Sequence, residues 1–156
     1  MYRHIGVYGI CVVNQQLLVV HKKRGPYIYR YDLPGGRMEE HETLLEAVVR
    51  EFHEETGLDV EVTQSLGLYD FVITRLEKAE HHVAGLYLVT ITGGQISAEG
   101  DDHDSSGAQW VDIDKLREDI ASPLVMKVIR YIQTGKLNLQ TVYYQDWLIL
   151  DAPPNV

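Results

Sequence analysis

The chain has 156 residues, of which 45% are hydrophobic, and its formal net charge is −9. This size predicts one domain over residues 1–156, with enough apolar residues to bury a core without disulfides. The negative charge argues against binding to extended nucleic acid, and no segment predicts a membrane span. The single cysteine, Cys11, lies in an apolar strand-like run, and the first residues do not resemble a signal peptide, so we expect a cytoplasmic protein.

The first elements predict a β-hairpin followed by a basic cluster. Residues 5–13 are rich in Val, Ile and Tyr, residues 14–16 suit a tight turn, and residues 17–21 return as a second strand. The basic cluster is His21-Lys22-Lys23-Arg24. It is either a solvated loop or a set of phosphate contacts, for which Lys22 and Arg24 are the candidates.

Three tyrosines alternate after the chain breaker Gly25-Pro26. They are Tyr27, Tyr29 and Tyr31. If this stretch is extended, their side chains share one face, and tyrosines in such a pattern more often pack against the protein than stack on a ligand ring. Two glycines follow, Gly35 and Gly36, and they would let the backbone approach a ligand closely. Gly35 is therefore a candidate substrate contact, and Tyr31 is a second candidate if its ring faces a ligand.

Residues 43–56 predict an amphipathic helix. Thr43 can cap its start, with Glu46 completing a capping box, and Gly57 can end it in the left-handed conformation. One apolar arc of this helix is predicted to pack against the core, and it contains Leu44, Leu45, Val48, Val49 and Phe52.

Three carboxylates lie beside that arc at positions i, i+3 and i+4, namely Glu51, Glu54 and Glu55. They repel one another on one helix face, and oxygen ligands of this kind suit a hard cation such as Mg²⁺. Glu55 projects at the edge of the buried side, where a carboxylate is costly unless it is paired or bound to metal. A solvated acidic face is the other interpretation, but Arg50 is the only Lys or Arg between Arg37 and Arg75.

The stretch from Gly36 to Leu58 resembles the Nudix hydrolase signature. Every fixed position of that signature is filled at the family's spacing, by Gly36, Glu42, Arg50, Glu51, Phe52, Glu54, Glu55, Gly57 and Leu58. The resemblance implies an α/β protein with the Nudix fold, in which a mixed β-sheet is sandwiched between helices (α/β/α). Residues 36–58, the Nudix box, would form its loop–helix–loop.

The resemblance also implies a reaction, the hydrolysis of the pyrophosphate bond in a nucleoside diphosphate linked to another group X. The cofactor would be Mg²⁺ or Mn²⁺, and the implied metal ligands are Glu51, Glu54, Glu55 and the carbonyl of Gly36. Arg50 would orient a catalytic carboxylate. The general base stays open between Glu51 and an acidic residue of the following loop, with Asp104 as first choice and Asp102 as second.

The rest of the chain predicts alternating strands and helices. Residues 58–73 suggest a strand bent at Gly67, residues 74–80 a charged loop, residues 82–92 a strand and residues 110–112 a short strand. Adjacent His81 and His82 would face opposite sides of a strand, which disfavours a metal site there. Helices are expected at 112–119 and 123–134, and the tail 136–156 is either an added strand or the contact of a homodimer.

Two other functions in the same family stay open. A nucleotide-sensing binding module would be expected to have lost the carboxylates, and all three are present. A diphosphate isomerase would need a proton donor such as a cysteine, and Cys11 is expected to be buried. The residues do not identify X, which we expect the loops 22–32, 74–82 and 94–107 to select.

Overall fold

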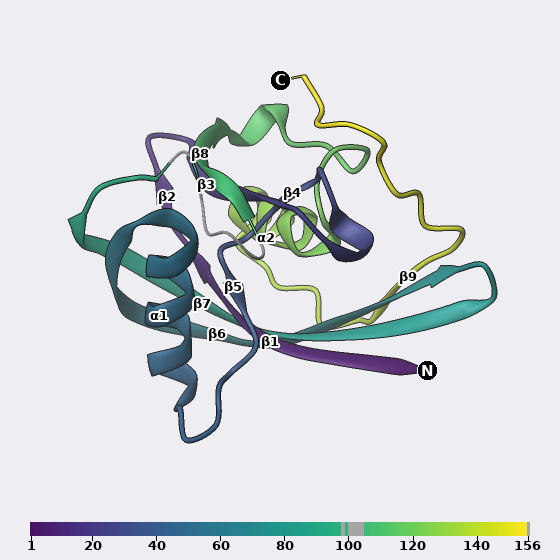
Figure 1. The fold of residues 1–156 in the computed structure, drawn as a ribbon, viewed down its shortest axis with the longest axis horizontal. Coiled ribbons are helices and arrows are strands. Elements are labelled where there is room, and N and C mark those ends of the chain that lie inside the picture. The colour runs from purple at the N-terminus through teal and green to yellow at the C-terminus, as the bar shows by residue number, and fades with distance from the viewer. Residues whose placement is uncertain (98, 100–104, 156) are drawn as a thin grey trace.

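The computed structural model describes residues 1–97, 99 and 105–155. Two helices lie on opposite sides of a layer of strands (Figure 1), α1 (Leu44–Thr56) and α2 (Pro123–Thr134). None of the helices in this described part of the chain combines the length and apolar character needed to cross a membrane. The arrangement confirms the predicted α/β/α sandwich, although its strands form two sheets and not one.

The larger sheet is mixed, because β1 and β7 run parallel whereas β6 and β7 run antiparallel. Its spatial order is β5 (Gly35–Gly36), β1 (Tyr2–Ile10), β7 (Lys78–Gly94), β6 (Leu58–Arg75) and β9 (Val142–Tyr144). The smaller sheet contains β2 (Val12–Val13), β3 (Gln16–Lys22), β4 (Tyr31–Asp32) and β8 (Ser105–Asp112). The pairing of β5 with β1 holds Gly35 and Gly36 at the edge of the larger sheet.

The core forms two clusters, one on each face of the strands. Neighbouring residues of a strand point to opposite faces, so Val7 packs in the cluster that contains Phe52 of α1, while Tyr8 packs in the cluster that contains Val125 of α2. The hairpin predicted from residues 5–21 is present, since β2 and β3 pair across the turn Asn14-Gln15.

The ends of α1 are those that its residues predict. The Thr43 hydroxyl accepts the N–H of Glu46, the Glu46 carboxylate accepts the N–H of Thr43, and Gly57 closes the helix at φ 78°. The predicted packing arc is wrong in part, because the side chains of Leu44, Leu45 and Val49 are exposed. The buried stripe instead follows the i, i+4, i+7 positions of Val48, Phe52 and Glu55, with Ala47 and Thr56.

Three further segments differ from their predictions. Residues 74–80 are not a loop, since β6 and β7 continue to a two-residue turn in which Leu76 and Glu77 both have positive φ. The helix expected at 112–119 is a single 3₁₀ turn, Ile113–Lys115. The stretch with the three tyrosines is not extended, because Gly25–Tyr27 forms a 3₁₀ turn, η1, and Tyr29 has φ 65°. In the tail, β9 is an added strand, parallel to β6.

The two helix-ending glycines allow a matched test of stability. Gly57 and Gly135 both have positive φ, but an added Cβ would lie 2.3 Å from the carbonyl oxygen of Gln95 at Gly57 and would meet nothing within 4 Å at Gly135. We expect Gly135→Ala to lower the free energy of unfolding by about 1 kcal/mol, from backbone strain alone. Gly57→Ala should lower it by about 1–3 kcal/mol more. Equal urea midpoints for the two variants would contradict this packing.

Candidate active site

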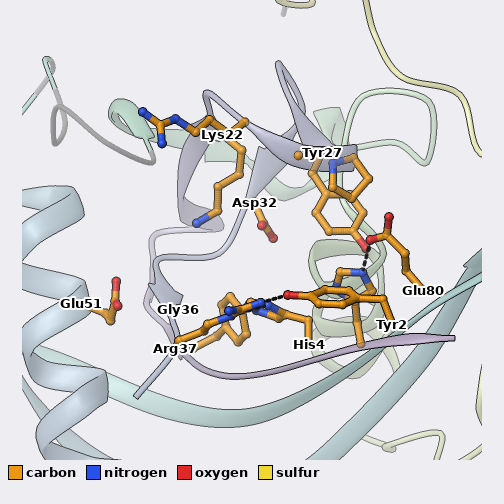
Figure 2. Close-up of a pocket in the computed structure, with 14 residues that line it drawn as sticks. Tyr2, His4, Lys22, Tyr27, Asp32, Gly36, Arg37, Glu51 and Glu80 are labelled. Carbon is orange, nitrogen blue, oxygen red and sulfur yellow. Dashed lines mark hydrogen bonds and ion pairs between the residues drawn. The ribbon is translucent and has the colours of Figure 1, made fainter. Parts of the chain in front are cut away.

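A cavity of about 510 Å³ opens beside α1 (Figure 2). Glu51 enters it from the helix on one side, Lys22 of β3 and Asp32 of β4 reach its middle, and Tyr27 and Glu80 stand on the opposite side. The other described lining residues are Tyr2, His4, Tyr8, Arg24, Gly25, Pro26, Gly36, Arg37 and His82. The cavity therefore has a carboxylate–lysine end and an aromatic end.

Glu55 forms a buried ion pair behind the carboxylate–lysine end. Its side chain is 0% exposed, one carboxylate oxygen lies 2.9 Å from the Lys22 ammonium, and the other accepts the N–H of Gly35 at 2.8 Å. Burial raises the pKa of Glu55 to about 7, although Lys22 and the Gly35 N–H favour the charged form. The expectation that a carboxylate at this edge of the helix needs a partner is confirmed.

Glu51 is the carboxylate of the trio that lines the cavity. Its side chain is 14% exposed, and burial raises its pKa although the Arg50 guanidinium, 3.1 Å away, opposes this shift. A Cβ added to Gly36 would lie 2.8 Å from a carboxylate oxygen of Glu51. The glycine at this position therefore leaves the room that the carboxylate occupies.

Arg50 connects the acidic residues of the Nudix box. Its guanidinium donates to Glu42 at 2.6 and 2.9 Å, to Glu51 at 3.1 Å and to Glu54 at 3.2 Å. It also donates to the carbonyl of Arg37. The bonds from Arg50 hold the pKa of Glu42 down, at about 2. This geometry agrees with the orienting role that the resemblance implies for Arg50.

Some of the predicted site residues lie at the cavity and others do not. Lys22, Arg24, Gly36 and Glu51 line the cavity, and Gly35 contacts its buried ion pair. Glu54 is absent from the described lining and points to Arg50, with its side chain 47% exposed.

Another predicted site residue does not line the cavity. Tyr31 is only 2% exposed and packs in the core cluster on the α2 side, so the structure does not support it as a substrate contact. The turn at Gly25–Tyr27 breaks the extended stretch that would have aligned the three tyrosines. Asp104 and the second-choice Asp102 lie outside the described residues.

Several lining residues were not predicted from the sequence. Asp32 is 3% exposed and accepts hydrogen bonds from the N–H of Leu33 and the hydroxyl of Ser122. Tyr8 is buried beside Lys22 and Asp32, and burial raises its pKa. The one signal for Asp32 was its place just before Pro34-Gly35-Gly36. Tyr2, His4, Glu80 and His82 carried none, because β1 and β7 contribute them from separate parts of the chain.

The donor set can be compared with the requirements of a divalent cation. Among the described residues, no three His, Cys, Asp or Glu side chains gather closely enough to hold a metal ion on their own. The chemistry nevertheless fits, because the oxygen ligands that Mg²⁺ prefers are present and Glu51 is desolvated beside the glycine that makes room for it. A cation there would offset the charge that burial penalises.

Known proteins resemble this chain in sequence. The family model for the NUDIX domain matches residues 2–130. An ADP-ribose pyrophosphatase from Methanocaldococcus jannaschii is 34% identical over 118 residues, which cover 74% of this chain and 67% of that protein. A Bacillus subtilis protein, named provisionally as an 8-oxo-dGTP diphosphatase, is 37% identical over 98 residues. The match spans 63% of this chain and 58% of the length of that relative.

Solved structures share the fold. A MutT NUDIX hydrolase from Burkholderia pseudomallei aligns with a TM-score of 0.67 at 23% identity, over 83% of this chain and 98% of that one. A MutT protein from Bacillus halodurans aligns with a TM-score of 0.66 at 23% identity, over 95% of each chain. At these identities the likeness shows the fold alone. The family model, however, covers well over half of the chain and includes the whole helix that carries the carboxylates, so the chain belongs to the Nudix hydrolase family.

Proposed function

We propose that this chain hydrolyses the pyrophosphate bond of a nucleoside diphosphate linked to another group X, with Mg²⁺ or Mn²⁺ as cofactor. The observation that carries the proposal is the partly desolvated Glu51 carboxylate, which faces a cavity that Lys22 and Arg24 also line. Carboxylates for a cation and basic groups for phosphate are the two requirements of this chemistry. The names of the relatives, an ADP-ribose pyrophosphatase and an 8-oxo-dGTP diphosphatase, support this substrate class.

The proposed cation ligands are Glu51, Glu54, Glu55 and the carbonyl of Gly36. A bound cation would offset the charge of the diphosphate and lower the pKa of a nearby water. Glu54 is held by Arg50 and Glu55 by Lys22, so these two carboxylates would exchange a protein partner for the cation.

The other roles in the proposed reaction fall to residues at the cavity wall. Lys22 and Arg24 would bind phosphate oxygens, and Arg50 would keep Glu51 oriented. We propose Glu51 as the base that takes a proton from the attacking water, because it is the member of the trio that reaches the cavity. Asp104 stays the second candidate for this role.

A substrate panel tests the proposal. The purified chain is incubated with ADP-ribose, 8-oxo-dGTP and a dinucleoside polyphosphate, with Mg²⁺ or with a chelator, and the released phosphates are measured. We expect Mg²⁺-dependent cleavage of at least one compound and at least a tenfold loss of rate in Glu54→Gln. Failure to cleave any compound, or full activity of Glu54→Gln, would count against it. Nucleotide binding that persists in chelator without turnover would favour a sensing module.

A further inference from the structure

The C-terminal segment lies beyond the family match yet reaches the cavity wall. The match ends at residue 130, whereas β9 pairs with β6 at the edge of the larger sheet and the residues after it turn away from that sheet (Figure 1). Trp147, 8% exposed, anchors this segment. Its backbone N–H donates to the carbonyl of Thr74 at 2.9 Å, and its indole N–H donates to the carbonyl of Pro26 at 2.8 Å. The indole bond ties the segment directly to the turn η1, whose three residues line the cavity.

Packing reinforces that connection. The indole ring meets the ring of Tyr27 edge-on, with centroids 5.7 Å apart. The Arg30 guanidinium lies 4.2 Å from the indole centroid and donates to the carbonyl of Leu148 at 2.9 Å. Trp147 therefore contacts the backbone and the neighbouring side chain of the turn that forms the far wall. A change at Trp147 should shift Tyr27 before it shifts Glu51 on the other side of the cavity.

The far wall contains two buried polar atoms that make no hydrogen bond within the described part of the chain. They are the hydroxyl of Tyr27 and Nε2 of His82. Both residues line the cavity and are more than nine-tenths buried, with their rings meeting edge-on at 5.2 Å. A buried polar group without a partner is costly, so these two atoms point to hydrogen bonds supplied by a ligand.

The charges at this end favour an uncharged ligand group. The Glu80 carboxylate, which stands at this end of the cavity in Figure 2, lies 3.4 Å from Nε2 of His82 and would repel an anion. Arg37 is engaged, since it donates to the Tyr2 hydroxyl and to Nδ1 of His4. Burial lowers the pKa of His82 to about 4, so its imidazole is neutral near pH 7. Aromatic rings with neutral polar tips suit a polar ring better than a phosphate.

We propose that the aromatic end of the cavity is a recognition subsite for an uncharged, hydrogen-bonding ring of the substrate, with Tyr27 as a specificity residue that Trp147 of the C-terminal segment holds in position. This inference rests on the proposed function for the other half of the ligand, the diphosphate bound near Lys22 and Glu51. The ring is either the nucleobase or a sugar, because both offer uncharged donors and acceptors. The tail residues around Trp147 would thus support the substrate site through η1, without lining the cavity themselves.

Calorimetric titration tests this subsite without turnover. Three ligands are used with Mg²⁺, namely AMP, ribose 5-phosphate and inorganic pyrophosphate, on Tyr27→Phe and Trp147→Phe. Tyr27→Phe removes the hydroxyl that would bond to the ligand, Trp147→Phe removes the indole bond to Pro26, and each variant keeps an aromatic ring. We expect the Kd of AMP to rise about 5- to 10-fold in both, because one bond to a buried group is lost or displaced. The Kd of pyrophosphate should not change. The matched controls are Tyr143→Phe, on the exposed face of β9, and Trp110→Phe, in β8.

The outcomes show whether the bound ring is the nucleobase or the sugar. If the affinity for ribose 5-phosphate falls as much as the affinity for AMP, the ring is the sugar. If only the affinity for AMP falls, the ring is the nucleobase. Unchanged affinity for both ligands would overturn the inference, as would an equal loss for pyrophosphate, which would indicate general distortion. Absence of cleavage in the substrate panel would remove the proposed reaction, but a selective loss of AMP binding would still support the subsite.

Discussion

Glu51→Gln is expected to lower kcat by about 100- to 10,000-fold, the range for loss of a group that accepts a proton in the reaction. The amide has nearly the shape of the carboxylate and can still accept the hydrogen bond from Arg50. It cannot take a proton from water, and it is a poorer ligand for a hard cation. The change is measured as kcat for whichever compound the substrate panel shows to be cleaved.

Stability separates this loss from misfolding. Burial disfavours the charged form of Glu51, so the neutral amide should leave the urea midpoint unchanged or slightly higher. Glu61→Gln, an exposed position on β6, is the matched control and should keep its full rate. A Glu51→Gln protein that retains more than a tenth of the wild-type kcat would exclude Glu51 as the base and direct attention to Asp104.

Lys22→Met should produce the largest loss of stability. It removes the partner of a carboxylate that is 0% exposed, and leaving one member of a buried pair uncompensated typically costs about 3–5 kcal/mol. Lys115→Met is the matched control, because it breaks an ion pair with Asp112 in which both side chains are about half exposed. That loss should stay below about 1 kcal/mol. Urea denaturation of the two variants and the wild type gives the comparison.

The loss in Lys22→Met should depend on pH in a defined direction. The pKa of Glu55 is about 7 in the folded chain against an ordinary value of 4.5, so between these values the folded state binds more protons and stability falls as pH rises. Without Lys22 the folded pKa rises further, and the fall continues to higher pH. The destabilisation should therefore be greater at pH 8 than at pH 6. The double variant Lys22→Met/Glu55→Gln should recover most of it, and no recovery would contradict the ion-pair explanation.

Helix α1 could be predicted from its sequence because its signals are local. Thr43, Glu46 and Gly57 act within one or two turns of the helix ends, and each does what its residue type suggests. Which arc of the helix packs was predicted only in part, since a helical pattern cannot show how far a partner surface extends. Leu44 and Leu45 fall at the first turn, where they are about half exposed. Leu76 and Glu77 hid a tight turn because neither is a typical turn residue.

The two ends of the cavity also differ in whether their residues could be predicted from the sequence. The end with Glu51 and Gly36 was predictable because the Nudix box carries both residues within one short stretch. The aromatic end was not, because Tyr2, Tyr27 and His82 come from three elements that meet only through the pairing of β1 with β7 and the docking of η1. The role of Trp147 depends on a contact across more than a hundred residues. No periodicity or spacing in the chain records a contact of that kind.

The position of Arg50 has a consequence for how the site loads. Its guanidinium already acts as the counter-ion of Glu51 and Glu54, so a divalent ion bound by both carboxylates would compete with it for their charge. Loading would then weaken two charged contacts, and the observed affinity for the ion would be lower than the intrinsic affinity by the free energy of that weakening. The two bonds to Glu42 would keep the guanidinium beside Glu51, where it could still orient that carboxylate. The acidic helix face would thus have positive charge beside it both before and after the ion binds.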